Sequence, residues 1–318
     1  MRPHDAPDDA HYLHERTQLQ ALLVPPIEDP RVLSWIPKSQ RLVVVNQAGS
    51  LFEVEPVFGT RKLGEVAGEP GAIAVDHERV AVMSRDGTLG VWTLPDLVQV
   101  WRGRSDLQAQ RRLIWCGAHL ILSGDDGEGK RWAFAYDTTG RLSLQIHMPS
   151  GAVVGAHPVS GELYIVRSTV AGLRRAAFGA PPTLGPHDRL FDVDATGMSR
   201  RDADNPPTSH RLTLTGDGSV LGIADGGVVV WPAGQSQPTT VRIGEVVTAN
   251  LSFDGAWLGI GTRGGGVAIA DLRNPAAARV NPQRTEGHAS TINQLEFAPR
   301  GQWLATLADK VRLWTASN

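Results

Sequence analysis

The chain has 318 residues, of which 31 are basic and 33 acidic, and its net charge is -2. This balance provides no electrostatic field that would recruit nucleic acid or an anionic membrane, so we expect neither as a partner. Cys116 is the single cysteine, which excludes an intrachain disulfide and a cysteine-based metal cluster and favours the reducing cytoplasm. No stretch approaches the roughly 20 apolar residues of a membrane span.

A chain of this length contains either two domains or one array of repeats, because a single hydrophobic core stops growing near roughly 250–300 residues. Its 35 glycines and 21 prolines supply many turns. The apolar runs are short and rich in Val, Ile and Leu, which is typical of strands and not of helices. Composition therefore favours one array of short strands, and the excess of arginine over lysine fits a bacterial gene.

The N-terminal segment divides into a polar tail and a strand-like run. Residues 1–12 are polar, and we expect a flexible tail there. Histidines and aspartates near this end, among them His4 and His11, could hold a transition metal, but polar tails are mostly disordered and we predict no metal site. Residues 17–24 are strand-like and belong to none of the units described next.

Seven stretches share the order strand, turn, strand, turn, strand. They are residues 32–54, 79–92, 113–136, 152–178, 212–231, 251–271 and 287–314. Asp86-Gly87 is a strong hairpin signal within the second stretch, because both central residues of a type I′ turn need positive φ. We therefore expect a type I′ turn at this dipeptide.

The last strands of these stretches are mostly about 40 to 45 residues apart, which is the period of a four-stranded repeat. A fourth, outer strand is expected between consecutive stretches, at 62–66, 98–103, 142–147, 189–193, 239–243 and 279–284. Residues 180–208 contain several prolines and make one gap longer, so they should carry an outer strand and an irregular insertion. The last stretch lacks an outer strand of its own, and the run at 17–24 is available to supply it.

The C-terminal stretch contains the most specific motif. Its ordered features are Gly287-His288, an alternating strand at 292–297, a turn, a small-residue strand with Thr306, then Asp309 and Trp314. This order resembles a WD40 repeat, one blade of a β-propeller. The resemblance implies an all-β, seven-bladed WD40-like β-propeller over residues 13–318, with the ring closed by the N-terminal strand in the last blade.

The resemblance also implies a structural role for four side chains of that stretch. In WD40 repeats a His, a Ser or Thr, an Asp and a Trp form a hydrogen-bonded tetrad, and His288, Thr306, Asp309 and Trp314 match it by residue type. Asp309 lies five residues before Trp314, whereas Asp86 lies six before Trp92, so the last hairpin should be shorter. A hydrolase with Thr306 as nucleophile is disfavoured, because the hydroxyl lies on a buried strand and no oxyanion-hole turn is visible. We predict no catalytic residue.

The resemblance implies a platform for protein–protein contacts, within a signalling, proteolytic or defence assembly. Arg85 and Arg263 lie in the second turns of their stretches, a loop class that WD40 proteins often use for partners. A further turn departs from the repeat pattern and is a second candidate for partner contacts. Its charged residues are Asp125, Asp126, Glu128, Lys130 and Arg131.

Two other functions stay open. One is an enzyme, a hydrolase or lyase, with its site in the central channel, and the other is a sensor of a small ligand or peptide. The histidines occupy different positions in their stretches, which disfavours the enzyme. Residues 192–197 resemble the start of a calcium-binding loop, but the glutamate expected at its twelfth position is replaced by Ala203. We predict no cofactor.

Nine tryptophans are many for a chain with 6% aromatic residues. Trp92, Trp231 and Trp314 end the third strands of their stretches and are expected to pack between blades. Four others have no such assignment, namely Trp35, Trp101, Trp115 and Trp132. Any of these that is exposed would be the leading candidate for a partner contact. Cys116 lies on an apolar run and is expected in the core.

Overall fold

The computed structural model describes residues 18–22, 24–66, 68–148, 153–156, 163–166, 171–176, 188–191, 212–214, 220–224, 227–231, 239–273, 287–301 and 303–317. The regular elements of these segments are 27 β-strands, so the fold is all-β as the sequence predicts. None of the described residues forms a helix that is long and apolar enough to cross a membrane.

The strands form antiparallel sheets of consecutive strands. The β2–β5 sheet contains β2 (Pro30–Trp35), β3 (Leu42–Asn46), β4 (Ser50–Glu55) and β5 (Gly59–Glu65). The β6–β9 sheet contains β6 (Pro70–Val75), β7 (Arg79–Ser84), β8 (Thr88–Thr93) and β9 (Gln99–Arg104). The β10–β13 sheet contains β10 (Ala109–Cys116), β11 (His119–Asp125), β12 (Arg131–Tyr136) and β13 (Leu142–Met148).

The second half of the chain repeats the same order. The β14–β17 sheet contains β14 (Val153–Ala156), β15 (Leu163–Val166), β16 (Ala171–Ala176) and β17 (Asp188–Phe191). The β18–β21 sheet contains β18 (Leu212–Leu214), β19 (Val220–Ala224), β20 (Gly227–Trp231) and β21 (Thr239–Arg242). The β22–β24 sheet has three described strands, β22 (Val246–Leu251), β23 (Trp257–Thr262) and β24 (Val267–Asp271).

The last sheet joins segments from opposite ends of the sequence. It contains β25 (Gln294–Phe297), β26 (Trp303–Leu307), β27 (Val311–Ser317) and β1 (Gln18–Leu22). β1 pairs antiparallel with β27, with Gln18 opposite Ser317 and Leu22 opposite Leu313.

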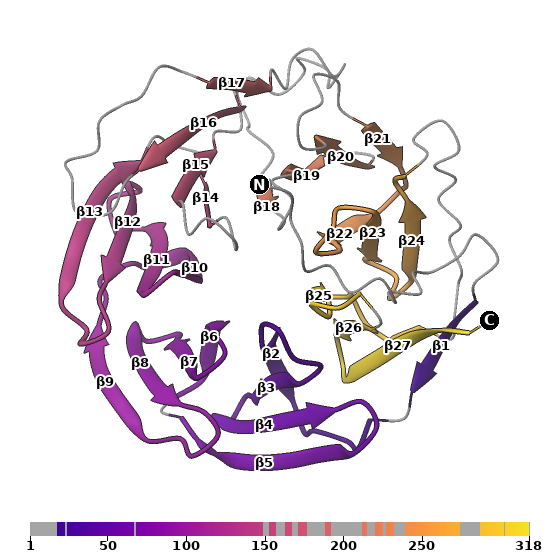
Figure 1. The fold of residues 1–318 in the computed structure, drawn as a ribbon, viewed down its shortest axis with the longest axis horizontal. Coiled ribbons are helices and arrows are strands. Elements are labelled where there is room, and N and C mark those ends of the chain that lie inside the picture. The colour runs from indigo at the N-terminus through magenta and orange to yellow at the C-terminus, as the bar shows by residue number, and fades with distance from the viewer. Residues whose placement is uncertain are drawn as a thin grey trace.

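The sheets are arranged radially around a common centre, and the innermost strands are β2, β6, β10, β14, β18, β22 and β25 (Figure 1). Neighbouring inner strands are close together around this centre, for example β2 beside β6, β6 beside β10, and β25 beside β2. Apolar side chains fill the spaces between neighbouring sheets. Val43 and Val45 of β3, for instance, share one buried cluster with Val80 and Val82 of β7. Where the side chains are described, neighbouring sheets thus bury apolar faces against each other.

The turn at Asp86-Gly87 differs from the type I′ prediction, which is wrong for this dipeptide. Gly87 has a φ of 91°, whereas Asp86 does not have a positive φ. The N–H of Gly87 donates to the carbonyl of Ser84 at 3.1 Å, and the Asp86 carboxylate accepts the N–H of Thr88 at 2.9 Å. The turn is therefore a type I turn followed by a glycine bulge, in which only the glycine needs positive φ.

The same turn recurs, with a positive-φ glycine donating to the carbonyl three residues earlier. The pairs are Gly49 with Asn46, Gly129 with Asp126, Gly140 with Asp137, Gly255 with Ser252, Gly265 with Thr262 and Gly301 with Ala298. At Gly87 the turn also contacts the chain that enters the next sheet. The N–H of Ser105 donates to the Gly87 carbonyl at 2.9 Å, and a Cβ at Gly87 would lie 2.6 Å from the Ser105 carbonyl oxygen.

The described outer strands β5, β9, β13, β17 and β21 overlap the five outer strands predicted between residues 62 and 243. The sixth predicted outer strand, at 279–284, lies outside the described residues. The same is true of the tail at 1–12, the histidines His4 and His11, the loop at 192–197, and most of the insertion at 180–208.

Candidate functional site

The structure brings together the four side chains of the C-terminal motif. His288 precedes β25, Thr306 lies on β26, Asp309 follows β26 and Trp314 lies on β27. The indole N–H of Trp314 donates to Thr306 Oγ1 at 2.8 Å, and Thr306 Oγ1 lies 2.7 Å from His288 Nε2. His288 Nδ1 lies 3.0 Å from Asp309 Oδ1, so the link to Asp309 is made although the hairpin is one residue shorter.

Donors and acceptors in this chain of bonds match one protonation state. Asp309 as a carboxylate only accepts, so His288 Nδ1–H donates to it and Nε2 accepts the Thr306 hydroxyl proton. Burial lowers the pKa of His288, and the hydrogen bond and charge of Asp309 offset only part of that effect. His288 is therefore neutral near pH 7. Burial alone would raise the pKa of Asp309, but the hydrogen bond from His288 lowers it overall.

The burial of this group indicates what it can do. Thr306 has 0% and His288 4% of its surface exposed. A nucleophile needs a substrate within reach, and the Thr306 hydroxyl instead lies under the loop that carries His288. The four side chains join that loop to β26 and β27, which is a structural role.

Arg85 and Arg263 occupy equivalent turns of the β6–β9 and β22–β24 sheets. The Arg85 side chain is 65% exposed, with Nε 3.2 Å from Glu69 Oε1. Arg263 is also exposed, and its main chain is fixed on both sides. Its N–H donates to the Glu245 carbonyl at 2.9 Å and its carbonyl accepts the Thr291 hydroxyl at 3.0 Å.

Most charged side chains of the acidic turn between β11 and β12 form hydrogen bonds or ion pairs within the turn. Asp125 and Arg131 form an ion pair at 3.2 Å, with 18% and 8% of their side chains exposed. Asp126 accepts main-chain N–H groups of Glu128 and Lys130, both at 2.9 Å. The exposed charges of this turn are Glu128 and Lys130, which pair at 2.6 Å.

The pKa of Asp126 follows from these bonds. The hydrogen bond from the Trp132 indole, at 2.9 Å, is the largest cause that lowers the pKa, and main-chain N–H groups add to it. Asp126 is thus an acceptor within the turn, and Trp132 has a partner that the sequence did not reveal.

Two of the unassigned tryptophans connect neighbouring sheets. The Trp115 indole of β10 donates to the Ala74 carbonyl of β6 at 3.3 Å. The Arg79 guanidinium lies 4.2 Å from the centre of the same ring and donates two hydrogen bonds to Asp76, at 2.9 and 2.6 Å. The Trp35 indole of β2 likewise joins its sheet to β25, because it donates to the Glu296 carbonyl at 3.0 Å.

None of the four unassigned tryptophans is fully exposed. Trp35 is buried, whereas Trp101, Trp115 and Trp132 are half-buried. Trp101 packs against Tyr136 with ring centres 5.6 Å apart. The condition for a tryptophan contact site is therefore not met at these positions. Cys116 is buried as predicted, and burial raises its pKa to about 11.

Sequence reasoning missed a polar group between β25 and β2. The Gln294 side chain accepts the N–H of Leu33 at 3.1 Å and donates to its carbonyl at 2.6 Å. It also donates to Glu296 Oε1 at 2.8 Å, while Glu296 Oε2 accepts the Trp35 N–H at 3.4 Å. The signal was the pair of polar residues two apart in an apolar inner strand, which places both on one face.

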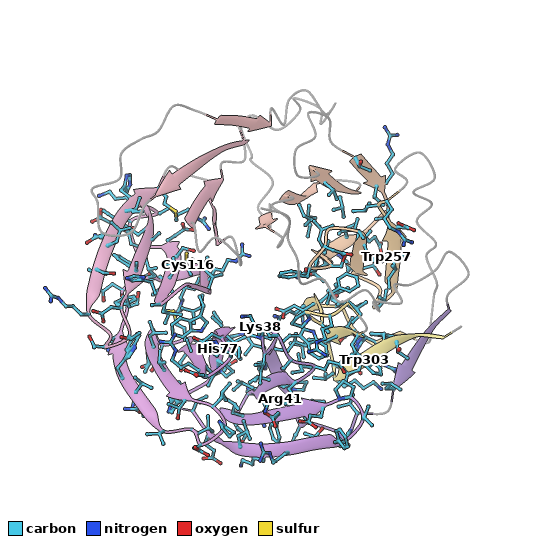
Figure 2. The ribbon with its side chains drawn as sticks, in the orientation of Figure 1. Lys38, Arg41, His77, Cys116, Trp257 and Trp303 are labelled. Atoms are coloured by element: carbon cyan, nitrogen blue, oxygen red, sulfur yellow. The ribbon has the colours of Figure 1, made fainter. Side chains whose placement is uncertain are left out.

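The Glu296 carboxyl is the most strongly perturbed acid in the described part of the chain. Burial raises its pKa to about 7, although hydrogen bonds from Gln294 and Trp35 and the charge of Arg112 act in the opposite direction. Figure 2 shows the side chains that fill the spaces between the sheets in this region, below the label of Trp257 and around that of Trp303. Among the described residues, no three His, Cys, Asp or Glu side chains gather in a way that could hold a metal ion.

No protein-family model and no curated protein matches this sequence. Solved structures are similar in fold. One is the β-propeller domain of Cps50 (Swd1) from Myceliophteria thermophila, with a TM-score of 0.70 and 12% identity over 94% of this chain and 100% of that chain. Another is Raptor from Chaetomium thermophilum, with a TM-score of 0.70 and 14% identity over 97% of this chain and 29% of that chain. At these identities the comparison shows the fold alone, which is similar to that of a β-propeller.

Proposed function

We propose that this chain is a seven-bladed WD40-like propeller that acts as a non-enzymatic platform for protein–protein contacts. Residues 13–318 form the propeller, and β1 closes the ring in the last blade. The pairing of β1 with β27 supports this closure, because it leaves no unpaired edge on β27. The outer strand of the β22–β24 sheet would then come from residues 279–284.

The platform role is supported by a contrast between residues used in hydrogen bonds and charged residues that face solvent. The residues that could take part in acid–base or nucleophilic chemistry, His288, Thr306 and Asp309, are used in hydrogen bonds that join strands. The charged residues of the turns, including Arg85, Glu128 and Lys130, face solvent instead. A rigid ring with charged turns is suited to recognition, in a cytoplasmic bacterial complex of the signalling, proteolytic or defence class.

The test is quantitative co-purification from the native host with tagged wild-type chain and a double variant, Arg85→Glu with Arg263→Glu. We expect specific protein partners with the wild type and a reduced amount of at least one with the variant. Lys62→Glu with Arg300→Glu makes the same change of charge elsewhere and should retain the partners. Equal recovery of all partners with both variants would contradict the use of these turns.

A further inference from the structure

The outer strand β9 exposes an unusual set of side chains. Val98, just before the strand, is 61% exposed, and Val100 is 43% exposed. Arg102 and Arg104, at the other end of the strand, are also exposed. We call these four residues the β9 strip. β9 is the last strand of its sheet, and no described strand pairs with its outer edge.

Basic groups exceed acidic ones among the described residues near the end of the strip that carries Arg102 and Arg104. The Cγ of Arg104 lies close to the turn at Gly87, and Arg85 of that turn is 65% exposed and pairs with Glu69 at 3.2 Å. Arg111 adds a third guanidinium, which donates to the main-chain carbonyls of Ser84 and Arg85 at 2.9 and 2.6 Å and forms no ion pair within 4.0 Å with an acid of the described residues. This concentration of arginines contrasts with the net charge of -2 for the whole chain.

The carboxylate of Asp86 lies near these arginines. The N–H and hydroxyl of Thr88 are the main causes that lower the pKa of Asp86. Burial opposes them, and the positive charges of Arg104 and Arg102 add the smallest lowering effects. The arrangement therefore favours an ionised carboxylate beside these two arginines.

Two of the corresponding outer strands, β5 and β13, differ from β9 in their charges. On β5, Arg61 pairs with Glu53 at 3.0 Å and Lys62 pairs with Glu65 at 3.0 Å, so both cations are compensated within their sheet. β13 carries no Lys, Arg, Asp or Glu. Within the described residues, Arg102 and Arg104 form no ion pair within 4.0 Å, so β9, unlike β5 and β13, combines unpaired positive charge with exposed valines.

We propose that the β9 strip binds an extended acidic segment of a partner protein. Apolar side chains of the segment contact Val98 and Val100, and its carboxylates pair with Arg102 and Arg104. A strand rises about 3.3 Å per residue, so acids two residues apart in the segment match the spacing of the two arginines. The proposal rests on the proposed role as a protein-binding platform, and it adds the place and the chemistry of the partner.

A protein segment fits this strip better than a nucleic acid. Single-stranded nucleic acids bind where bases can stack on aromatic rings beside basic groups. The nearest aromatic side chain on this strand, Trp101, packs on Tyr136 with ring centres 5.6 Å apart. The exposed side chains beside the arginines are aliphatic and offer no stacking surface.

Fluorescence anisotropy with the full chain tests the proposal. The probe is a labelled synthetic peptide with two valines and then two glutamates, each separated by one serine. We expect binding that weakens with salt and falls at least roughly tenfold in Arg102→Glu with Arg104→Glu, because attraction is replaced by repulsion at two positions. Val98→Ser with Val100→Ser should weaken binding several-fold.

The control is Lys62→Glu with Arg300→Glu, which changes the net charge equally and should leave binding unchanged. Equal loss with this control, or equal binding of a peptide with lysines in place of the glutamates, would overturn the proposal. Tighter binding of a single-stranded oligonucleotide at the same arginines would overturn it in favour of nucleic acid. If the peptide fails to bind but partners still co-purify, only the β9 strip is wrong and the platform role stands.

Discussion

The indole N–H of Trp35 donates to the main-chain oxygen of Glu296 at 3.0 Å, which joins β2 to β25 across 261 positions of sequence. The Glu296 carboxyl accepts the Trp35 main-chain N–H in return, at 3.4 Å. Gln294 adds two hydrogen bonds to Leu33 on the same strand. Polar side chains thus join the β2–β5 sheet to the sheet that contains β25. The two sheets are not paired by main-chain hydrogen bonds of a β-ladder.

The first prediction concerns the pH dependence of this interface. Burial raises the pKa of Glu296 to about 7 from an ordinary 4.5, so the folded chain disfavours the ionised form. The contribution of Glu296 to stability is full below the unfolded pKa and is lost as pH rises to about 7. The loss should be about 3 kcal/mol, from roughly 1.4 kcal/mol per pKa unit.

Denaturant unfolding at pH 5 and pH 8 measures this loss. Other groups also titrate in this range, so the comparison is with Glu296→Gln, which keeps the shape and cannot ionise. The difference in free energy of unfolding between pH 5 and pH 8 should be smaller in the variant by about 2–3 kcal/mol, because pH 5 already lies above the unfolded pKa. Identical pH profiles for the two proteins would show that Glu296 does not change its ionisation in this range.

The second prediction concerns Thr306, which accepts the indole N–H of Trp314 and lies 2.7 Å from His288 Nε2. Thr306→Val keeps the shape and leaves two buried polar groups without a partner. We expect a loss of about 2–6 kcal/mol, since each such group costs about 1–3 kcal/mol. Thr306→Ser restores the hydroxyl and should recover most of the stability in thermal and denaturant melts. Equal destabilisation by Val and Ser would assign the effect to lost packing and not to the hydrogen bonds.

Local patterns in the sequence revealed most of the strands and the hydrogen-bonded group of four residues that includes Thr306. Outer strands such as β9 and β13 show as short runs between turn residues, and the His288 to Trp314 motif lies within one sheet, so its spacing is preserved along the chain. The turn at Asp86-Gly87 was assigned the wrong type. An Asp-Gly pair fits both a two-residue and a three-residue turn, and the choice depends on the strand register.

Contacts between sheets were not visible in the sequence. Glu296 contacts Trp35 only because β25 lies beside β2, and no spacing along one chain encodes that neighbour. The sequence marked Asp126 only as a candidate for partner contacts. Its bond to the Trp132 indole was not visible, because that bond depends on how β12 leaves the turn. Such partners can be identified only after the sheets have been placed relative to one another.

The third prediction separates backbone strain from packing at the turn glycines. Gly87 and Gly59 have φ values of 91° and 99°. A Cβ at Gly87 would lie 2.6 Å from the Ser105 carbonyl oxygen, whereas a Cβ at Gly59 has nothing within 4 Å. Gly59→Ala should cost only the strain of a positive φ, about 1–2 kcal/mol. Gly87→Ala should cost clearly more, because the turn must also move away from the next sheet, and equal melting temperatures for the two variants would contradict that contact.

The fourth prediction concerns β1. Leu22 and Val24 pack against the buried cluster that contains Leu313, and β1 covers the outer edge of β27. Deleting residues 1–24 should expose this edge and its apolar surroundings, and an exposed strand edge pairs with other chains. We expect the truncated protein to aggregate in size-exclusion chromatography and light scattering. Deleting residues 1–12 leaves β1 in place and should give a protein that stays monodisperse at the same concentration. A soluble product with a cooperative melt from the longer deletion would show that β1 is dispensable, and the proposed closure of the ring would then have to come from another segment.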